Sequence, residues 1–197
     1  MSNNNRVYNV LIVGVGGQGI ILASDVLAMT AARHGYDVKK NEIHGMAQRG
    51  GSVSSHVRFG KIVSSPIIKM GEADVLLSFE QIETLRYFPF LSANGKVIVN
   101  DLKVLPPAVF TGQMDYPAGV LGKIKEKVPD TVVVDADALA KKIGNPRIVN
   151  VIFLGVLSKF LDIPEHTYEE VLKENLKPKL VDINLKAFQE GRSLVKG

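Results

Sequence analysis

Two short segments carry the residue types that could bind an anion. The first, Gly14-Val15-Gly16-Gly17-Gln18-Gly19, has the glycine spacing G-x-G-x-x-G and lies between an apolar run and a helical stretch. In this motif the spaced glycines permit a tight turn, the approach of an anion to the backbone, and close packing of a helix on a strand. The N-terminus of the following helix adds unpaired N–H groups and partial positive charge. The segment therefore indicates contact with a phosphate-bearing group, and a tight turn without a ligand is the alternative.

A dinucleotide is a weaker expectation for the same glycine loop. A Rossmann enzyme places an acidic residue at the end of its second strand, about 20 residues after the glycines. The nearest acid here, Glu42, precedes a glycine-rich loop instead of ending an apolar run. Gly17 and Gln18 also make the loop unusually polar. The glycine spacing therefore does not by itself establish NAD binding.

The second segment, His44 to Gly51, reads His-Gly-Met-Ala-Gln-Arg-Gly-Gly and has neither a helical nor a strand period. The guanidinium of Arg49, beside the carboxamide of Gln48, can present planar donors to a carboxylate or a phosphate. Gly50 and Gly51 leave room for backbone N–H groups to join this contact. Arg49 is therefore the first candidate for an anion contact. Its pairing with an acidic group of this chain or of a partner is the alternative.

Two histidines lie within or near this segment. His44 belongs to a residue type that titrates near neutral pH, but the sequence places no carboxylate or nucleophile beside it. A structural hydrogen bond is therefore expected for His44. His56 falls on the polar face of an alternating stretch, where we expect a surface residue or an interface contact.

The surrounding sequence predicts alternating strands and helices. Residues 7–13 form an apolar run typical of a buried parallel strand, and residues 20–34 predict the helix after the glycine loop. Alternating apolar residues over 53–59 predict a strand that turns at Gly60 into a second hairpin strand, 62–67. Further strands are expected at 36–40, 75–79, 97–100 and 132–134, and further helices at 80–91, just before 144, and at 147–160, 164–176 and 180–194.

This order predicts an α/β fold: a Rossmann-like, doubly wound, mostly parallel sheet with an edge β-hairpin and a helical C-terminal region. Hydrophobic residues make up 46% of the 197 residues and charged residues 22%, ordinary values for a globular protein. One domain over residues 1–197, with a polar tail at 1–6, is therefore expected. The stretch 105–119 holds three prolines and predicts a long loop of a kind that is often functional or interface-forming.

Charge and composition exclude several classes of protein. The formal net charge is only +4 and the lysines are scattered, whereas nucleic-acid binding requires clustered basic residues. The sequence shows no run of about 18 apolar residues and no cleavable leader, so a cytoplasmic protein without a membrane partner is expected. The chain has no cysteine, so it can form no disulfide and ligate no ordinary iron–sulfur cluster. Any such redox centre would belong to a partner.

Together the two segments resemble a known family. The glycine loop, followed by residues 44–60, is similar to the gamma-type domain of the pyruvate and 2-oxoacid:ferredoxin oxidoreductases. The sequence Met-Ala-Gln-Arg-Gly-Gly-Ser-Val at 46–53 most resembles the small (beta) subunits of indolepyruvate:ferredoxin oxidoreductases. The resemblance runs from about residue 7 to residue 191. Its further matches are Ser65-Pro66, Glu72-Ala73-Asp74, Gly95 to Asn100, Asp135-Ala136, Asn150, Leu154-Gly155 and residues 181–191.

The resemblance implies the oxidative decarboxylation of a 2-oxoacid, most of all indolepyruvate, to its acyl-CoA with reduction of ferredoxin. It also implies that a large (alpha) partner subunit holds thiamine diphosphate, Mg and 4Fe-4S clusters, because this chain has neither cysteine nor a Gly-Asp-Gly signature. Coenzyme A would be the co-substrate. The resemblance implies no catalytic residue in this chain. We expect only a phosphate, anion or interface contact from Gly14, Gly16, Gly17, Gln18, Gly19, Gln48, Arg49, Gly50 and Gly51.

Three other interpretations stay open on the sequence. The chain could serve a complex for another 2-oxoacid, such as pyruvate, 2-oxoglutarate, a branched-chain acid or phenylglyoxylate. It could be a free-standing oxidoreductase that binds NAD or a flavin through the glycine loop. It could also be a binding or regulatory module without a catalytic partner.

Overall fold

The computed structural model describes residues 6–45, 50–105 and 107–195, and within them six strands form one sheet in the order β2-β3-β1-β4-β5-β6. The strands are β1 (Val7–Val15), β2 (Asp37–His44), β3 (Ser52–Gly60), β4 (Ala73–Ser78), β5 (Leu91–Asn100) and β6 (Val132–Val134). Strands β1, β4, β5 and β6 run parallel to one another, and β3 pairs antiparallel with both β1 and β2. The predicted class, a mostly parallel sheet with an edge hairpin, is confirmed.

The position of the edge hairpin differs from the prediction. The second strand extends to His44 and pairs with β3 from Asp37 opposite Gly60 to His44 opposite Val53. Because β3 has β1 on its other side, both of its edges are filled. No edge remains for a strand at 62–67, so the predicted pairing of 53–59 with 62–67 is wrong. Instead, Arg58 Nη1 donates to the carbonyl oxygens of Ser65 and Ile67, at 3.0 and 3.1 Å, and holds that segment as a loop.

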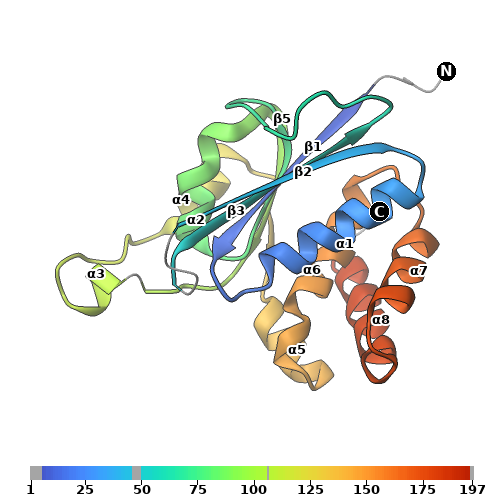
Figure 1. Cartoon of the computed structure of the whole chain (residues 1–197). Helices are drawn as coiled ribbons and strands as arrows, with labels where there is room; N and C mark the ends of the chain where they lie inside the picture. Colours follow the sequence, from blue (N-terminus) through green and yellow to red (C-terminus); the bar gives the residue numbers. More distant parts are fainter. Residues whose placement is uncertain (1–5, 46–49, 106, 196–197) are drawn as a thin grey trace.

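Helices cover both faces of the sheet (Figure 1). Helices α1, α5, α6, α7 and α8 lie on one face, and α2 and α4 lie on the other. The predicted helical C-terminal region is present. The helices are α1 (Ile20–Arg33), α2 (Gln81–Tyr87), α3 (Pro107–Phe110), α4 (Val120–Lys127), α5 (Ala136–Ile143), α6 (Val149–Leu157), α7 (Glu165–Asn175) and α8 (Pro178–Ser193), with 3₁₀ turns η1 (Phe88–Phe90), η2 (Pro146–Ile148) and η3 (Ser158–Phe160).

The apolar runs of the sequence become the buried strands and helix α6. In β1, Val10 and Ile12 face the helices of the larger layer, and Leu11 and Val13 face the opposite side. Every residue of α6 from Asn150 to Leu157 is buried. The predicted helix 80–91 is shorter than expected because Pro89 ends the α-helical hydrogen bonding in the turn η1. Strand β5 then begins at Leu91, ahead of its predicted start.

The chain order creates a crevice at the carboxyl end of the sheet. From β1 the chain crosses through α1 towards β2 and β3, whereas from β4 it crosses through α2 towards β5. Parallel sheets bind ligands where neighbouring strands send their connections in opposite directions. The fold therefore places the glycine loop, which follows β1, beside the residues that follow β4.

Candidate functional site

The glycine loop joins the carboxyl end of β1 to helix α1. Gly17 and Gly19 have φ angles of 104° and 86°, which side chains with a Cβ rarely adopt. Gly19 is the N-cap of α1, and no side chain accepts a hydrogen bond there. The first turn of α1 therefore presents N–H groups without a side-chain cap, as an anion-binding helix N-terminus does.

The side chain of Gln18 folds back into the glycine loop. Its Oε1 accepts a hydrogen bond from the Val15 N–H at 2.7 Å, and its Nε2 donates to the carbonyl oxygen of Phe79 at 3.2 Å. A Cβ built on Gly14 would lie 2.6 Å from that Oε1 and 2.9 Å from the Cβ of Phe79. Gly14 thus leaves room for the Gln18 side chain. Gln18 in turn joins the glycine loop to Phe79, which directly follows strand β4.

The structure brings the end of the second segment against the glycine loop. The Gly16 N–H donates to the carbonyl oxygen of Gly51 at 2.8 Å, and the Gly50 N–H donates to the carbonyl oxygen of Gly16 at 3.4 Å. Two predicted site segments are therefore joined through their backbones. Gln48 and Arg49 lie outside the described residues.

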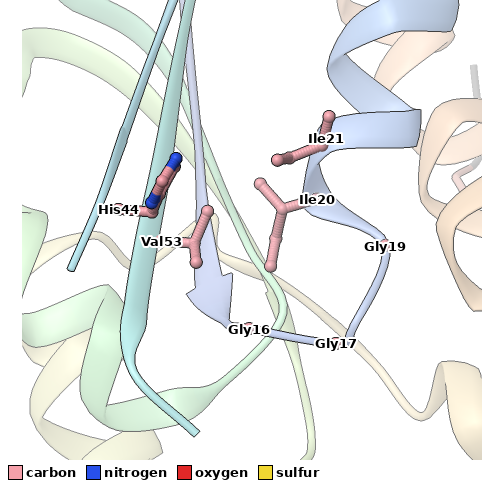
Figure 2. A pocket seen from close by; sticks show the side chains of 7 residues that line it. All are labelled: Gly16, Gly17, Gly19, Ile20, Ile21, His44 and Val53. Carbon is pink, nitrogen blue, oxygen red and sulfur yellow. The ribbon is translucent and has the colours of Figure 1, made fainter. Parts of the chain in front are cut away.

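An apolar pocket of about 400 Å³ lies on one side of the glycine loop. Figure 2 shows Ile20 and Ile21 on one wall, Val53 and His44 on the other, and the glycines at the base. The exposed His44 ring contacts the neighbouring Gly45 carbonyl oxygen through Nδ1 at 3.3 Å. This pocket suits an apolar group more than a charged one.

A second pocket of about 440 Å³ lies on the other side of the loop and is more polar. Asn100 donates from Nδ2 to Asp137 Oδ2 at 2.8 Å and to the carbonyl oxygen of Phe79 at 3.3 Å. Arg147 and Asn150 complete the polar lining. The sequence analysis did not assign these four polar residues to a site. The available signal was the position of Asn100 at the carboxyl end of a parallel strand, where ligands bind in such sheets.

Two buried carboxylates at the start of helix α2 hold the 105–119 stretch and the residue that follows the second segment. Glu80, 1% exposed, accepts hydrogen bonds from the Glu83 and Val104 N–H groups and from the Tyr116 hydroxyl at 2.8 Å. Glu83 accepts from Ser52, which directly follows Gly51. Burial, reinforced by the hydrogen bond to Glu80, raises the pKa of Tyr116 above its usual range. The hydroxyl therefore remains a proton donor to Glu80 at neutral pH.

His56 is buried, not at the surface. It is 2% exposed, its Nδ1 accepts the Ile68 N–H at 3.1 Å, and its ring contacts the edge of Phe90. Burial lowers the pKa of the imidazole. The predicted surface role is wrong because the 61–72 loop, held by Arg58, covers this face of β3.

Glu42 offers no free acid for a ribose. Its carboxylate is ion-paired with Lys40, which also contacts Asp25 of helix α1. These ion pairs fasten the middle of β2 to α1. Glu42 is therefore placed as an ion-pair partner, and its position does not support the binding of a dinucleotide ribose.

The donor set does not fit an iron–sulfur cluster, since the chain contains no cysteine. Within residues 6–45, 50–105 and 107–195, no three His, Asp or Glu residues gather in a way that could hold a metal ion. In the same ranges no helix is long and apolar enough to cross a membrane.

Comparison with known proteins identifies the family. The pyruvate ferredoxin/flavodoxin oxidoreductase family model matches residues 9–194. The indolepyruvate oxidoreductase subunit IorB of Archaeoglobus fulgidus is 43% identical over 188 residues, covering 93% of this chain and 92% of the relative. The common gamma subunit of the pyruvate/ketoisovalerate oxidoreductases of Thermococcus kodakarensis is 29% identical, covering 90% and 91%. The keto/oxoacid ferredoxin oxidoreductase gamma subunit of Geobacter sulfurreducens is 25% identical in sequence with a TM-score of 0.71, covering 95% and 97%. The chain belongs to the pyruvate ferredoxin/flavodoxin oxidoreductase family.

Proposed function

We propose that this chain is the small subunit of an indolepyruvate:ferredoxin oxidoreductase. The observation that carries the proposal is the difference in identity between two kinds of relative. The chain is 43% identical to an indolepyruvate oxidoreductase subunit but 29% identical to a gamma subunit shared by pyruvate and ketoisovalerate enzymes. Both relatives align over at least 90% of the chain. The difference in identity is therefore not the result of a short aligned segment, and it favours the aryl 2-oxoacid.

The complex would convert indolepyruvate, coenzyme A and two oxidised ferredoxins into the acyl-CoA, carbon dioxide, two reduced ferredoxins and one proton. Thiamine diphosphate with Mg would supply the decarboxylation chemistry, and 4Fe-4S clusters would carry the electrons. We assign both to a large (alpha) subunit because this chain has no cysteine to ligate a cluster and no Gly-Asp-Gly signature for the metal and diphosphate. The chain itself would act as one gamma-type domain that shapes the contact with coenzyme A and with the large subunit.

The proposed contact residues are those of the two joined loops. Gly17 and Gly19 would present backbone N–H groups to a phosphate-bearing ligand or to the partner. Gly16, whose N–H is bound to the Gly51 carbonyl oxygen, would let the ligand approach the backbone. Gln18 and Gly14 would maintain the loop that does so, as their contacts with Val15 and Phe79 indicate. Gly50 and Gly51 are held against Gly16 and would set the place of the preceding Gln48 and Arg49.

Anaerobic co-expression of this chain with the proposed large (alpha) subunit tests the assignment. We expect a brown complex that reduces ferredoxin with indolepyruvate and coenzyme A, and no reduction by this chain alone. Indolepyruvate should give a higher kcat/KM than pyruvate or 2-oxoglutarate. A complex that prefers pyruvate, or ferredoxin reduction by the isolated chain, would refute the proposal.

Arg49→Ala tests the anion-contact loop in the same complex. We expect ferredoxin reduction or recovery of the complex to fall about tenfold or more, because a guanidinium that binds an anion contributes a charge-assisted hydrogen bond. Lys125→Ala on the exposed surface of α4 is the control and should change either quantity less than twofold. Equal effects of the two substitutions would remove the reason for singling out Arg49.

A further inference from the structure

The pocket of about 440 Å³ lies where the N-terminal ends of two helices meet. One wall consists of Gly17 and Gly19 just before α1, and the other includes Arg147 in the turn η2 and Asn150 at the start of α6. Helix α1 has 14 residues and α6 has nine, and the N-cap residue of neither provides a side-chain cap. Both helix dipoles therefore place partial positive charge at this pocket.

Asn150 adds a buried donor that the protein itself leaves unused. The residue is 4% exposed, and its Oδ1 accepts the Val151 N–H at 3.0 Å. Its Nδ2 has no hydrogen-bond partner within the described ranges, although it lines the pocket. A Cβ built on Gly19 would lie 3.2 Å from this Nδ2, so the amide is directed at the N-cap of α1. The Nδ2 atom can be reached from the pocket, and an acceptor on a ligand there would give it a hydrogen-bond partner.

The other buried asparagines show that this arrangement is not general. The Nδ2 of Asn100 donates to Asp137 and to the carbonyl oxygen of Phe79. The Nδ2 of Asn184 donates to the carbonyl oxygen of Leu180 at 2.7 Å. The described part of the chain thus pairs these two amides internally and directs that of Asn150 into a pocket.

The remaining charged groups of the pocket define the class of ligand. The exposed guanidinium of Arg147 makes no ion pair with the residues that the structure describes. Asp137 accepts from Asn100 through Oδ2, so Oδ1 remains available to a donor. An uncapped helix N-terminus, a free amide and a guanidinium suit a phosphate, whereas a carboxylate suits a hydroxyl group. A phosphate ester that carries hydroxyl groups meets both demands.

We propose that the pocket between α1 and α6 binds a phosphate ester, with the phosphate on the Gly19 N-cap and the Asn150 amide. Arg147 strengthens the attraction from the rim, and Asp137 accepts a hydroxyl of the same ligand. The proposal rests on the phosphate contact suggested above for the glycine loop and specifies its side, its residues and its ligand class. The apolar pocket on the other side of the loop is left to an uncharged group.

Calorimetric titration of the full chain, alone and in the assembled complex, tests this site. The probes are inorganic diphosphate, coenzyme A and NAD. Diphosphate tests for a site that binds phosphate alone, and coenzyme A and NAD test which of two phosphate esters binds better. Asn150→Asp replaces the donor with a negative charge and should weaken binding of the preferred probe about tenfold or more. Asn184→Asp removes a buried amide far from the pocket and should change that affinity less than twofold. Arg147→Gln alters an exposed side chain and should weaken binding about threefold or more.

The outcomes separate this inference from the proposed function. Loss of binding in Asn150→Asp and Arg147→Gln, with folding confirmed by circular dichroism, supports the site whichever ester binds better. If Asn150→Asp does not fold, Arg147→Gln decides. Unchanged affinity in the folded variants, or no binding of any probe by the wild-type chain and complex, overturns the site. Ferredoxin reduction by the wild-type complex would still support the proposed function in either case.

Discussion

At the scale of single residues, His56 makes stability depend on pH. Burial lowers the pKa of its imidazole from the ordinary value of 6.5. The unfolded chain therefore binds a proton more readily than the folded chain as the pH falls. The contribution of His56 to stability is complete above about pH 6.5 and is lost progressively as the pH falls below that value.

We expect the free energy of unfolding to decrease between pH 7 and pH 5 in the wild-type chain. His56→Gln keeps an acceptor for the Ile68 N–H but cannot be protonated, so its free energy should decrease less over this range. The measurement is urea unfolding at several pH values. His34→Gln, at an exposed position, is the control and should retain the wild-type slope. The same slope in both variants would show that burial of His56 does not set the pH dependence.

The sequence predicted the backbone of the glycine loop better than the side-chain contacts around it. The glycine spacing predicted a tight turn after the first strand, and Gly19 of that motif has a positive φ, which favours glycine, as does its neighbour Gly17. It could not reveal that the Gln18 side chain folds back, since that depends on the position of the Phe79 carbonyl, 61 residues away. The pocket role of Asn150 depends likewise on packing between α1 and α6. Local sequence contains no information about such distant neighbours.

At the scale of elements, helices α6 and α8 cross at short distance. A Cβ built on Gly155 would lie 2.1 Å from the carbonyl oxygen of Phe188, and one built on Gly191 would lie 2.1 Å from that of Ile152. Two facing glycines thus let the helix backbones touch. Any side chain there must push α8 away from the core helix, because backbone atoms cannot rotate aside.

Gly155→Ala should therefore lower the free energy of unfolding by about 3 kcal/mol, the upper part of the usual overpacking cost. Gly122→Ala is the matched control, because Gly122 is also helical and a Cβ there meets nothing within 4 Å. It should stabilise the chain slightly, by about 0.5 kcal/mol. Thermal and urea unfolding measure both. A Gly155→Ala chain as stable as the Gly122→Ala chain would contradict the close crossing.

Among the elements, periodicity predicted the positions of individual strands but failed to predict which distant strands pair. The strand at 53–59 was found from its alternation, yet its partner was misassigned to 62–67. Turn residues at Gly60-Lys61 favour a hairpin only if an edge of the first strand is free. In the fold β1 and β2 occupy both edges of β3. The pairing of β3 with β1 joins segments about 45 residues apart, a relation that alternation alone cannot express.

At the scale of the whole molecule, the stretch between β5 and α4 extends away from the sheet (Figure 1). It carries three large apolar side chains that the folded chain leaves exposed: Leu105 at 51%, Phe110 at 80% and Met114 at 64%. Its base is held by Glu80, which accepts from Val104 and Tyr116. A firmly anchored segment with exposed apolar side chains is typical of a subunit contact. The sequence prediction that 105–119 is functional or interface-forming stays a prediction, and these exposed side chains give a way to test it.

Phe110→Ser should accordingly leave the isolated chain as stable as the wild type, within about 0.5 kcal/mol, because the side chain is mostly exposed. In the proposed complex the same substitution should lower recovery of the large subunit in anaerobic co-purification, since the contact would lose apolar area. Ile62→Ser, at a position 73% exposed in another loop, is the matched control and should leave recovery unchanged. Equal recovery with both variants would place the subunit contact elsewhere. If only Phe110→Ser lowers recovery of the large subunit, the stretch 105–119, which packs outside the chain's own core, forms part of the subunit contact.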